Sequence, residues 1–355
     1  MGGYVPDYIL DNDEMSRIVE TSDEWIMERI GVKTRHILRP EQGSGTSYMM
    51  TRAVRQLLRK TGVAPDSVEL VICATTTPDY HFPSTASLVI GNCGLVGAFG
   101  YDMEAACASF LYGMEAAAAY IRCGRYKRVI VCGGDHMSSM TNYEDRNSCP
   151  IFGDGAACVM MEATTEEVGL IDGYYRVDGK GYQPLHMAAG GSAKMPTHET
   201  VSAREHYVYQ EGRAVYKHAV LDMTSAVKTI MERNGLTSSD VDWVVPHQAN
   251  INIEVSVAQR IGVEKDHVMI NIDHMANTSG GTLPLCLWEY EPQLKKGDKL
   301  VFTAFGAGFT WGASYMIWGY DGAKEAAKEP AEFFKEGLMT REAWYKLRQS
   351  EKNED

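Results

Sequence analysis

The sequence predicts an α/β protein made of two similar halves. Continuous apolar runs alternate with helical segments along the chain, a pattern that favours largely parallel sheets covered by helices. Stretches of the first half also recur, in the same order, in the second half. The chain has 355 residues, 45% of them hydrophobic, which is enough for a substantial core.

Local patterns locate the main elements of the first half. Residues 47–60 have a helical apolar pattern that Gly62 interrupts. Residues 68–74 form a continuous apolar run, typical of a strand buried on both faces. A helix is expected from about Thr85, and another strand over residues 128–132.

Three pairs of segments indicate an internal duplication. They are residues 62–72 with 235–245, 99–107 with 268–277, and 152–160 with 305–316. One pair of short apolar runs can match by chance, but three pairs in the same order argue against chance. Two halves packed about a pseudo-twofold axis would bring corresponding corners toward one central cleft.

Cys107 lies at one of these corners, where a strand turns into a helix over residues 105–121 that Gly124 ends. Unpaired N–H groups and the helix dipole at such a position stabilise a thiolate. We therefore expect an acidified, nucleophilic thiol. Taken alone, this stretch favours a small packing residue, as we expect for the other seven cysteines, so the case for a nucleophile depends on the rest of the chain.

Two further residues suggest chemistry. His247 stands where an apolar strand enters a loop, the edge at which α/β sheets usually place their sites. Asn277 occupies the corner that corresponds to Cys107, although asparagine also suits a helix cap. A lone histidine is more often structural, and we assign His81 to loop structure.

A Cys-His-Asn set fits two chemistries. In a thiol protease, the histidine deprotonates the cysteine and the asparagine orients the histidine. In a carbon–carbon bond-forming synthase, the cysteine carries an acyl group while histidine and asparagine donate hydrogen bonds to a thioester oxygen. Cys107 lacks a CGSCW-like context, and the duplicated scaffold is not a protease layout, so we favour the synthase.

Composition restricts the partners, the cellular location and the state of the cysteines. A formal net charge of −13 without long Lys/Arg blocks argues against a nucleic-acid partner. No apolar run suits a secretion signal or a membrane span, so we expect a cytoplasmic protein. The eight cysteines lie scattered in apolar segments without CxxC pairs, which predicts reduced thiols and neither disulfides nor a metal site.

Several motifs together resemble β-ketoacyl-acyl carrier protein synthase III, the condensing enzyme that starts type II fatty acid synthesis. They are residues 21–25 (TSDEW), 75–77 (TTT), 82–84 (FPS), 105–107 (AAC), 151–156 (IFGDGA), 246–250 (PHQAN), 277–279 (NTS) and 305–312 (FGAGFTWG). The resemblance covers residues 3 to about 320. The Cys-His-Asn set also distinguishes the chain from elongating synthases, which use two histidines.

The resemblance implies a thiolase fold, with duplicated α/β halves in a layered α-β-α-β-α arrangement. Residues 1–165 would form the half that carries the nucleophile, and residues 166–320 the half that carries His247 and Asn277. Residues 321–355 lie beyond the common family end. Their pattern around Trp344 and Leu347 favours at least one helix.

The resemblance also implies the catalytic roles. Cys107 would take the acyl group of a short acyl-CoA, and His247 and Asn277 would promote decarboxylation of malonyl-acyl carrier protein. Backbone N–H groups of Cys107 and Ala307 would form the oxyanion hole, and Phe305 would act as the gating phenylalanine. This chemistry uses no metal or other cofactor.

The resemblance also implies four residues that bind CoA: Thr21, Trp25, Arg29 and Arg146. An indole face and guanidinium groups suit an adenine and its phosphates. Thr21 or Ser22 is placed to cap the helix that carries Trp25 and Arg29.

The resemblance further implies a homodimer in which Phe82 would close the acyl pocket of the partner. An acidic carrier protein would need a basic patch on this chain. Each basic residue of that patch can also be explained as ordinary solvated surface charge. The docking residues implied are Arg213, Lys217, Gln248 and Arg260.

Three residues depart from the family pattern. Ser109 and Ala276 stand where glycine is usual, and Asn252 stands where arginine is common. We also expect the opening strand of the family to be absent, so that one sheet loses a strand. These departures keep three alternatives open: a synthase using branched or longer acyl-CoA primers or making secondary metabolites, a weakly active paralogue with a structural or acyl-binding role, and a thiol hydrolase.

Overall fold

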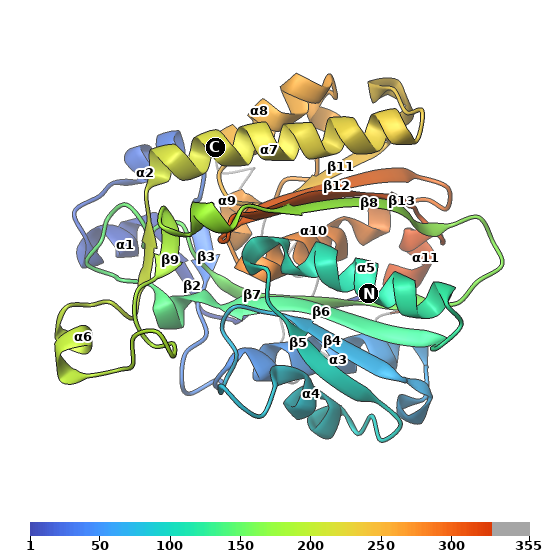
Figure 1. Cartoon of the computed structure of the whole chain (residues 1–355), viewed down its shortest axis with the longest axis horizontal. Helices are drawn as coiled ribbons and strands as arrows, with labels where there is room; N and C mark the ends of the chain where they lie inside the picture. Colours follow the sequence, from blue (N-terminus) through green and yellow to red (C-terminus); the bar gives the residue numbers. More distant parts are fainter. Residues whose placement is uncertain (329–355) are drawn as a thin grey trace.

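The computed structural model describes residues 1–328, which form five layers in the order helix, sheet, helix, sheet, helix (Figure 1). This is the arrangement that the family resemblance implied. The helix expected around Trp344 and Leu347 lies outside the described residues.

The first sheet contains five strands. In spatial order they are β1 (Gly2–Tyr4), β7 (Asp154–Glu162), β6 (Arg128–His136), β4 (Leu70–Ala74) and β5 (Phe99–Met103). The strands β5, β4 and β6 are parallel, whereas β7 and β1 run antiparallel to their neighbours. Every residue of β4 is buried, as its continuous apolar run predicted.

The second sheet repeats this pattern with four strands. They are β11 (Trp243–Pro246), β12 (Lys299–Gly306), β13 (Thr310–Ile317) and β8 (Gly169–Val177). Strands β11, β12 and β13 correspond to β4, β6 and β7, and the duplicated segments predicted the first and last of these pairs. The counterpart of β5 is reduced to one parallel bridge between Val244 and Val268.

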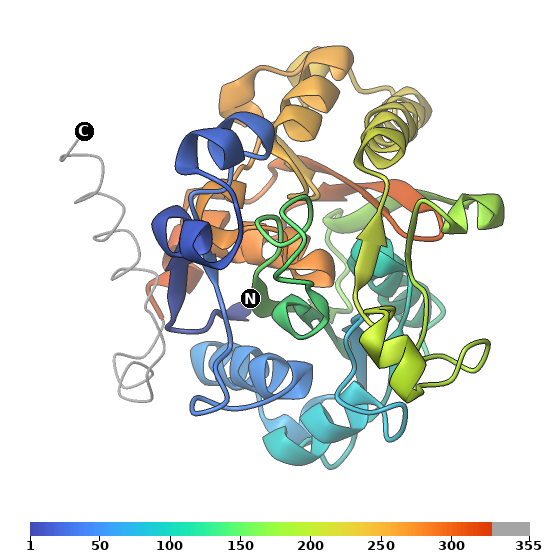
Figure 2. The same ribbon diagram turned by 90° about the vertical axis from the view of Figure 1, so that its left-hand side faces the viewer.

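Helices cover both sheets and fill the space between them (Figures 1 and 2). The outer helices are α3 (Thr46–Thr61) and α4 (Thr85–Cys93) on the first sheet, and α7 (Gly212–Arg233) and α8 (Ile251–Ile261) on the second. The central layer contains α5 (Ser109–Arg122) and α10 (Thr282–Tyr290). Gly62 ends α3 in the left-handed conformation, with φ of 67°.

Short elements complete the described chain. They are β2 (Ile9–Asp11), α1 (Asn12–Ile18), α2 (Asp23–Arg29), β3 (Thr34–His36), β9 (Leu185–Met187), α6 (His198–Ser202), β10 (Val208–Gln210), α9 (Ile272–Met275) and α11 (Gly322–Ala326). The pair β9 and β10 lies beside the end of α7, and α6 projects from the body of the molecule (Figure 1).

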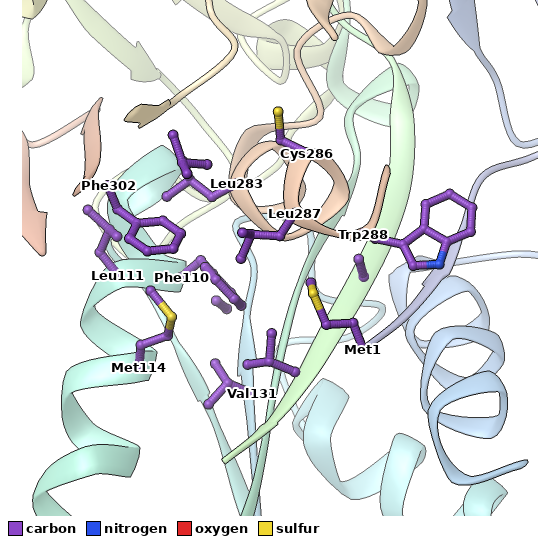
Figure 3. Packing of buried hydrophobic residues seen from close by; sticks show 14 of the residues in the cluster. Met1, Phe110, Leu111, Met114, Val131, Leu283, Cys286, Leu287, Trp288 and Phe302 are labelled. Carbon is purple, nitrogen blue, oxygen red and sulfur yellow. The ribbon is translucent and has the colours of Figure 1, made fainter. Parts of the chain in front are cut away.

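The largest hydrophobic core lies between the two sheets (Figure 3). Phe110 and Met114 of α5, Leu287 of α10 and Phe302 of β12 are at most 1% exposed. Each such side chain contributes about 1.5–3 kcal/mol of transfer free energy on burial. This packing fixes the start of α5, and therefore the residues just before it, against both halves.

The expected loss of a strand from the first sheet is wrong. Gly2–Tyr4 pairs antiparallel with residues 156–158 of β7 and forms the edge strand β1. Glycine is required there because a Cβ on Gly3 would lie 2.4 Å from the Trp288 ring. The turn-like sequence thus forms a strand because it fits between α3 and α10.

Candidate active site

Cys107 lies in a tight turn between β5 and α5. Residues Ala106–Ala108 form one turn of 3₁₀ helix, and Ala106 has a positive φ of 48°, a strained conformation for alanine. The turn is held from the second half, where Gly306 at the end of β12 packs against it. A Cβ on Gly306 would lie 2.6 Å from the Cys107 nitrogen.

The thiol of Cys107 is not acidified in this environment. Burial raises the pKa of Cys107 to about 12, with smaller contributions from the negative charges of Asp135 and Glu104. The Ser279 hydroxyl, 3.6 Å from Sγ, opposes this shift only partly. The expectation of a thiolate at the helix start is therefore wrong for the free protein, because desolvation outweighs the helix terminus.

His247 follows β11 and is buried, with 2% of its surface exposed. Its Nδ1 lies 2.7 Å from Oγ1 of Thr282, the first residue of α10. Burial lowers the pKa of His247 to about 3, so the imidazole is neutral over the physiological range. It can therefore donate or accept a hydrogen bond without carrying charge.

Asn277 is held by backbone and side-chain contacts. Its N–H donates to the Ile151 carbonyl at 2.9 Å, and its carbonyl accepts from Gly153 N–H at 3.1 Å. Its Oδ1 accepts from Ser279 N–H at 2.8 Å. Because Oδ1 is engaged in this way, the amide Nδ2 is the group left to act as a donor.

The three predicted catalytic residues line one cleft of about 340 Å³. Ala307 and Phe305 line the same cleft, as do Thr76, Glu104 and Ser279. Phe305 is 3% exposed, and its ring packs 4.8 Å from that of Phe309. The two pseudo-equivalent corners therefore meet at a common site, as the duplication predicted.

The predicted CoA residues lie in two neighbouring segments. Trp25 and Arg29 are on α2, Thr21 precedes it, and Arg146 is in the 141–150 loop. Ser22, not Thr21, caps α2 by accepting from Trp25 N–H at 3.2 Å. The Arg146 guanidinium lies 4.8 Å from the centre of the Trp25 ring, and Arg29 is exposed at the end of α2. Thr21 Oγ1 and Arg146 Nε are buried and have no hydrogen-bond partner within the described residues.

Phe82 lies away from the cleft of its own chain and is 87% exposed. Its loop follows β4 and precedes α4. An apolar ring in this setting has no packing role among residues 1–328.

Three of the four predicted docking residues lie on the surface, and one does not. Arg213 and Lys217 are exposed on α7, and Arg260 is exposed on α8. Gln248 is fully buried, so assigning it to docking is wrong. Its amide instead bonds the carbonyls of Pro246 and Met269 and accepts from Asn271 and Ile272 N–H groups.

Sequence reasoning missed three residues of the site, of which Glu104 and Ser279 line the cleft. Thr282 supports His247, and Ser279 contacts both Asn277 and Cys107. Glu104 accepts from Ala106 N–H at 2.8 Å, and partial desolvation raises the pKa of its carboxyl to about 7. All three lie within five residues of Cys107 or Asn277, and that proximity was the available signal.

Within residues 1–328, no helix is both long and apolar enough to cross a bilayer. The same part of the chain contains no group of three or more His, Cys, Asp or Glu side chains arranged to hold a metal ion. All eight cysteines lie in it as free thiols.

Comparison with known proteins agrees with this geometry. Residues 101–179 match the family described as 3-oxoacyl-[acyl-carrier-protein (ACP)] synthase III, and residues 231–318 match its C-terminal part. A Bacteroides thetaiotaomicron protein named beta-ketoacyl-[acyl-carrier-protein] synthase III 2 is 59% identical over 326 residues, covering 92% of this chain and 97% of that protein.

Solved structures give the same result. The synthase III of Thermus thermophilus has a TM-score of 0.83 at 34% identity, covering 90% of this chain and 98% of that one. The Aquifex aeolicus enzyme has a TM-score of 0.82 at 33% identity, covering 89% and 98%. The chain therefore belongs to the β-ketoacyl-[acyl-carrier-protein] synthase III family.

Proposed function

We propose that this condensing enzyme joins a short acyl-CoA, with acetyl-CoA as the first candidate, to malonyl-acyl carrier protein in the initiating step of type II fatty acid synthesis. The products are 3-oxoacyl-acyl carrier protein, CoA and CO₂. The observation that carries the proposal is the common cleft lined by Cys107, His247 and Asn277.

In the first half-reaction the Cys107 sulfur attacks the acyl-CoA carbonyl. The carbon–sulfur bond to CoA breaks, and the thiol proton of Cys107 ends on the CoA sulfur. Backbone N–H groups of Cys107 and Ala307 would stabilise the oxyanion. The close approach of Gly306 to the Cys107 nitrogen supports this pairing.

In the second half-reaction the malonyl thioester loses CO₂, and the resulting carbanion attacks the acyl group on Cys107. The bond from the acyl carbon to the Cys107 sulfur breaks, and the released thiolate takes up a proton from solvent. His247 Nε2 and Asn277 Nδ2 would donate hydrogen bonds to the thioester oxygen as negative charge develops there. This needs the His247 tautomer with its proton on Nε2, in which Nδ1 would accept a hydrogen bond from the Thr282 hydroxyl 2.7 Å away. Phe305 would keep water from the decarboxylation site.

Acyl-CoA would enter past Trp25 and Arg146. Stacking an adenine between them needs two contacts of about 3.5 Å each, or about 7 Å. The observed 4.8 Å is too short, so an adenine that contacts both groups would have to part them. Thr21 and Arg29 would bind nearby groups of the CoA.

A homodimer would use the open edge of β5. That strand pairs only with β4 among the described strands, and Phe99 on it is 44% exposed. An antiparallel pair of β5 strands would continue the sheet and remove an exposed edge. Phe82 would then reach the partner's cleft and limit the acyl chain.

The carrier protein would dock on α7 and α8. Arg213, Lys217 and Arg260 are exposed there on a protein whose net charge is −13. Asn252, also exposed on α8, contributes no charge, so the patch depends on the other three.

The experiment is mass spectrometry of the purified protein after incubation with acetyl-, isobutyryl- and hexanoyl-CoA, followed by a condensation assay with malonyl-acyl carrier protein. We expect an acyl adduct on Cys107 and a 3-oxoacyl product, both lost in Cys107→Ala. Absence of adduct and product with every acyl-CoA would support the paralogue alternative. Release of free acid without condensation would support the hydrolase.

A further inference from the structure

Asp135 is a buried carboxylate at the end of β6, near the Cys107 thiol. It accepts six hydrogen bonds. They come from Thr75 Oγ1 at 2.7 Å, Thr76 N at 2.7 Å, Thr76 Oγ1 at 3.2 Å, Thr77 N at 3.0 Å, Thr77 Oγ1 at 2.9 Å and Gly280 N at 2.8 Å. Within residues 1–328 it forms no ion pair, so neutral donors alone solvate this carboxylate.

The two carboxylate oxygens serve different halves of the protein. Oδ1 binds the loop after β4, which includes Thr76 on the wall of the cleft. Oδ2 binds Gly280, which belongs to the turn that follows Asn277. A single side chain therefore joins the first-half wall to the second-half turn.

The turn at Gly280 governs how Asn277 is presented. Its neighbour Ser279 donates its N–H to Asn277 Oδ1 at 2.8 Å, which directs Nδ2 away from that bond. The Ser279 hydroxyl also lies 3.6 Å from the Cys107 sulfur. A shift of this turn would thus move an amide donor relative to the nucleophile.

Packing leaves this turn little freedom. A Cβ on Gly280 would lie 2.8 Å from the Ala74 carbonyl oxygen and 3.2 Å from Asp135 Oδ2. A Cβ on Gly133 would lie 2.3 Å from the Gly280 carbonyl oxygen. The turn therefore rests directly on β4 and β6, and the bond from Gly280 to Asp135 fixes its position.

We infer that Asp135 is a positioning residue that holds the Asn277 turn against the cleft wall, so that Asn277 can assist decarboxylation. The inference rests on the proposed function of Asn277. Removing the Oδ2 acceptor should slow decarboxylation and condensation, while Oδ1 keeps the Thr75–Thr77 loop in place for acyl transfer.

The main variant is Asp135→Asn, which keeps an oxygen for the Thr75–Thr77 loop and places an NH₂ group opposite the Gly280 N–H. We expect condensation to fall at least tenfold, the equivalent of one hydrogen bond, while acylation of Cys107 changes less than threefold. Gly280→Ala is the second variant, because it displaces the turn and leaves the carboxylate intact. It should give the same pattern.

Asp154→Asn is the matched control. Asp154 is also fully buried and accepts from Ser138 N–H at 2.8 Å and Leu38 N–H at 2.8 Å, but it has no bond to the Asn277 turn. We expect it to lower stability without changing the ratio of the two half-reactions. An unchanged ratio in Asp135→Asn, or an equal change in Asp154→Asn, would overturn the inference.

Two further measurements separate this inference from the proposed function. Wild-type protein and Asn277→Ala are assayed in parallel, and an inactive wild type counts against the proposed function alone. A crystal structure of Asp135→Asn gives a readout independent of activity. The Ser279–Gly280 turn should move away from β6, and an unmoved turn would contradict the positioning role.

Discussion

Nε2 of His274, in the short helix α9 that leads to Asn277, lies 2.9 Å from Oε2 of Glu289 on α10. His274 Nδ1 also lies 2.7 Å from Asp273 Oδ1, and both His274 and Glu289 are buried. Burial alone would lower the pKa of His274, but the two carboxylates overcome it and raise the pKa to about 9. The imidazolium therefore ties α9 to α10.

This pair predicts a loss of stability in alkali. The pKa of His274 is higher in the folded protein than in the unfolded chain. The protonated imidazole therefore stabilises the fold fully below about pH 6.5, and this stabilisation is lost as pH rises through about 9. The loss is about 3 kcal/mol. Urea unfolding from pH 6 to 10 measures it. The control His274→Lys keeps its charge and should lose less over this range, and parallel curves for the two proteins would contradict the assignment.

Cys107 should react as a thiol in the free enzyme. With its pKa raised to about 12, its alkylation by iodoacetamide should increase steadily from pH 7 to 10 without a plateau. Peptide mass spectrometry separates Cys107 from the exposed Cys123, which serves as the internal reference. A plateau below pH 8 would instead indicate the thiolate that the helix start suggested.

Thr282→Val tests the support of His247. Valine has nearly the same shape but cannot bond Nδ1, so the imidazole loses the contact that fixes its orientation. We expect the kcat of condensation to fall about tenfold, with KM for acyl-CoA little changed. Ser87→Ala, at an exposed site on α4, is the control for hydroxyl loss. Equal effects of the two variants would refute the role of Thr282.

Ala276→Gly should stabilise the protein. Ala276 has φ of 57° and ψ of −165°, a region that glycine occupies freely and alanine occupies at a cost. The free energy gained by relieving this strain exceeds the entropic cost of ordering the more flexible glycine on folding. We therefore expect a gain of about 1 kcal/mol in the free energy of unfolding. Thermal denaturation measures the gain. A lower Tm would show that the Ala276 side chain contributes packing that outweighs its strain.

Ser109→Ala should also stabilise it. The Ser109 hydroxyl is fully buried and has no hydrogen-bond partner within the described residues, and a buried unsatisfied polar group costs about 1–3 kcal/mol. Alanine also has the better helix propensity at the start of α5. Chemical denaturation measures the change, and a destabilised variant would point to a hydrogen bond formed by Ser109 in solution.

The sequence by itself predicted alternating strands and helices and the duplication, and it marked Cys107, His247 and Asn277 as candidates for the site, whereas the layered arrangement came from the family resemblance. Apolar periodicity, glycine stops and repeated motifs are local properties, so they can be read without coordinates. The strand β1 was missed because three residues of turn-like sequence became a strand only through pairing with β7.

Tertiary structure alone decided the chemical state of the site. The pKa of Cys107 depends on desolvation by both halves, and Gln248 is buried because residues 269–272 fold over it. Asp135 reads as one more acidic residue after an apolar strand, yet its bonds reach Thr76 and Gly280, 59 and 145 positions away. Such properties depend on contacts between residues far apart in the chain, and these exist only once the two halves pack together.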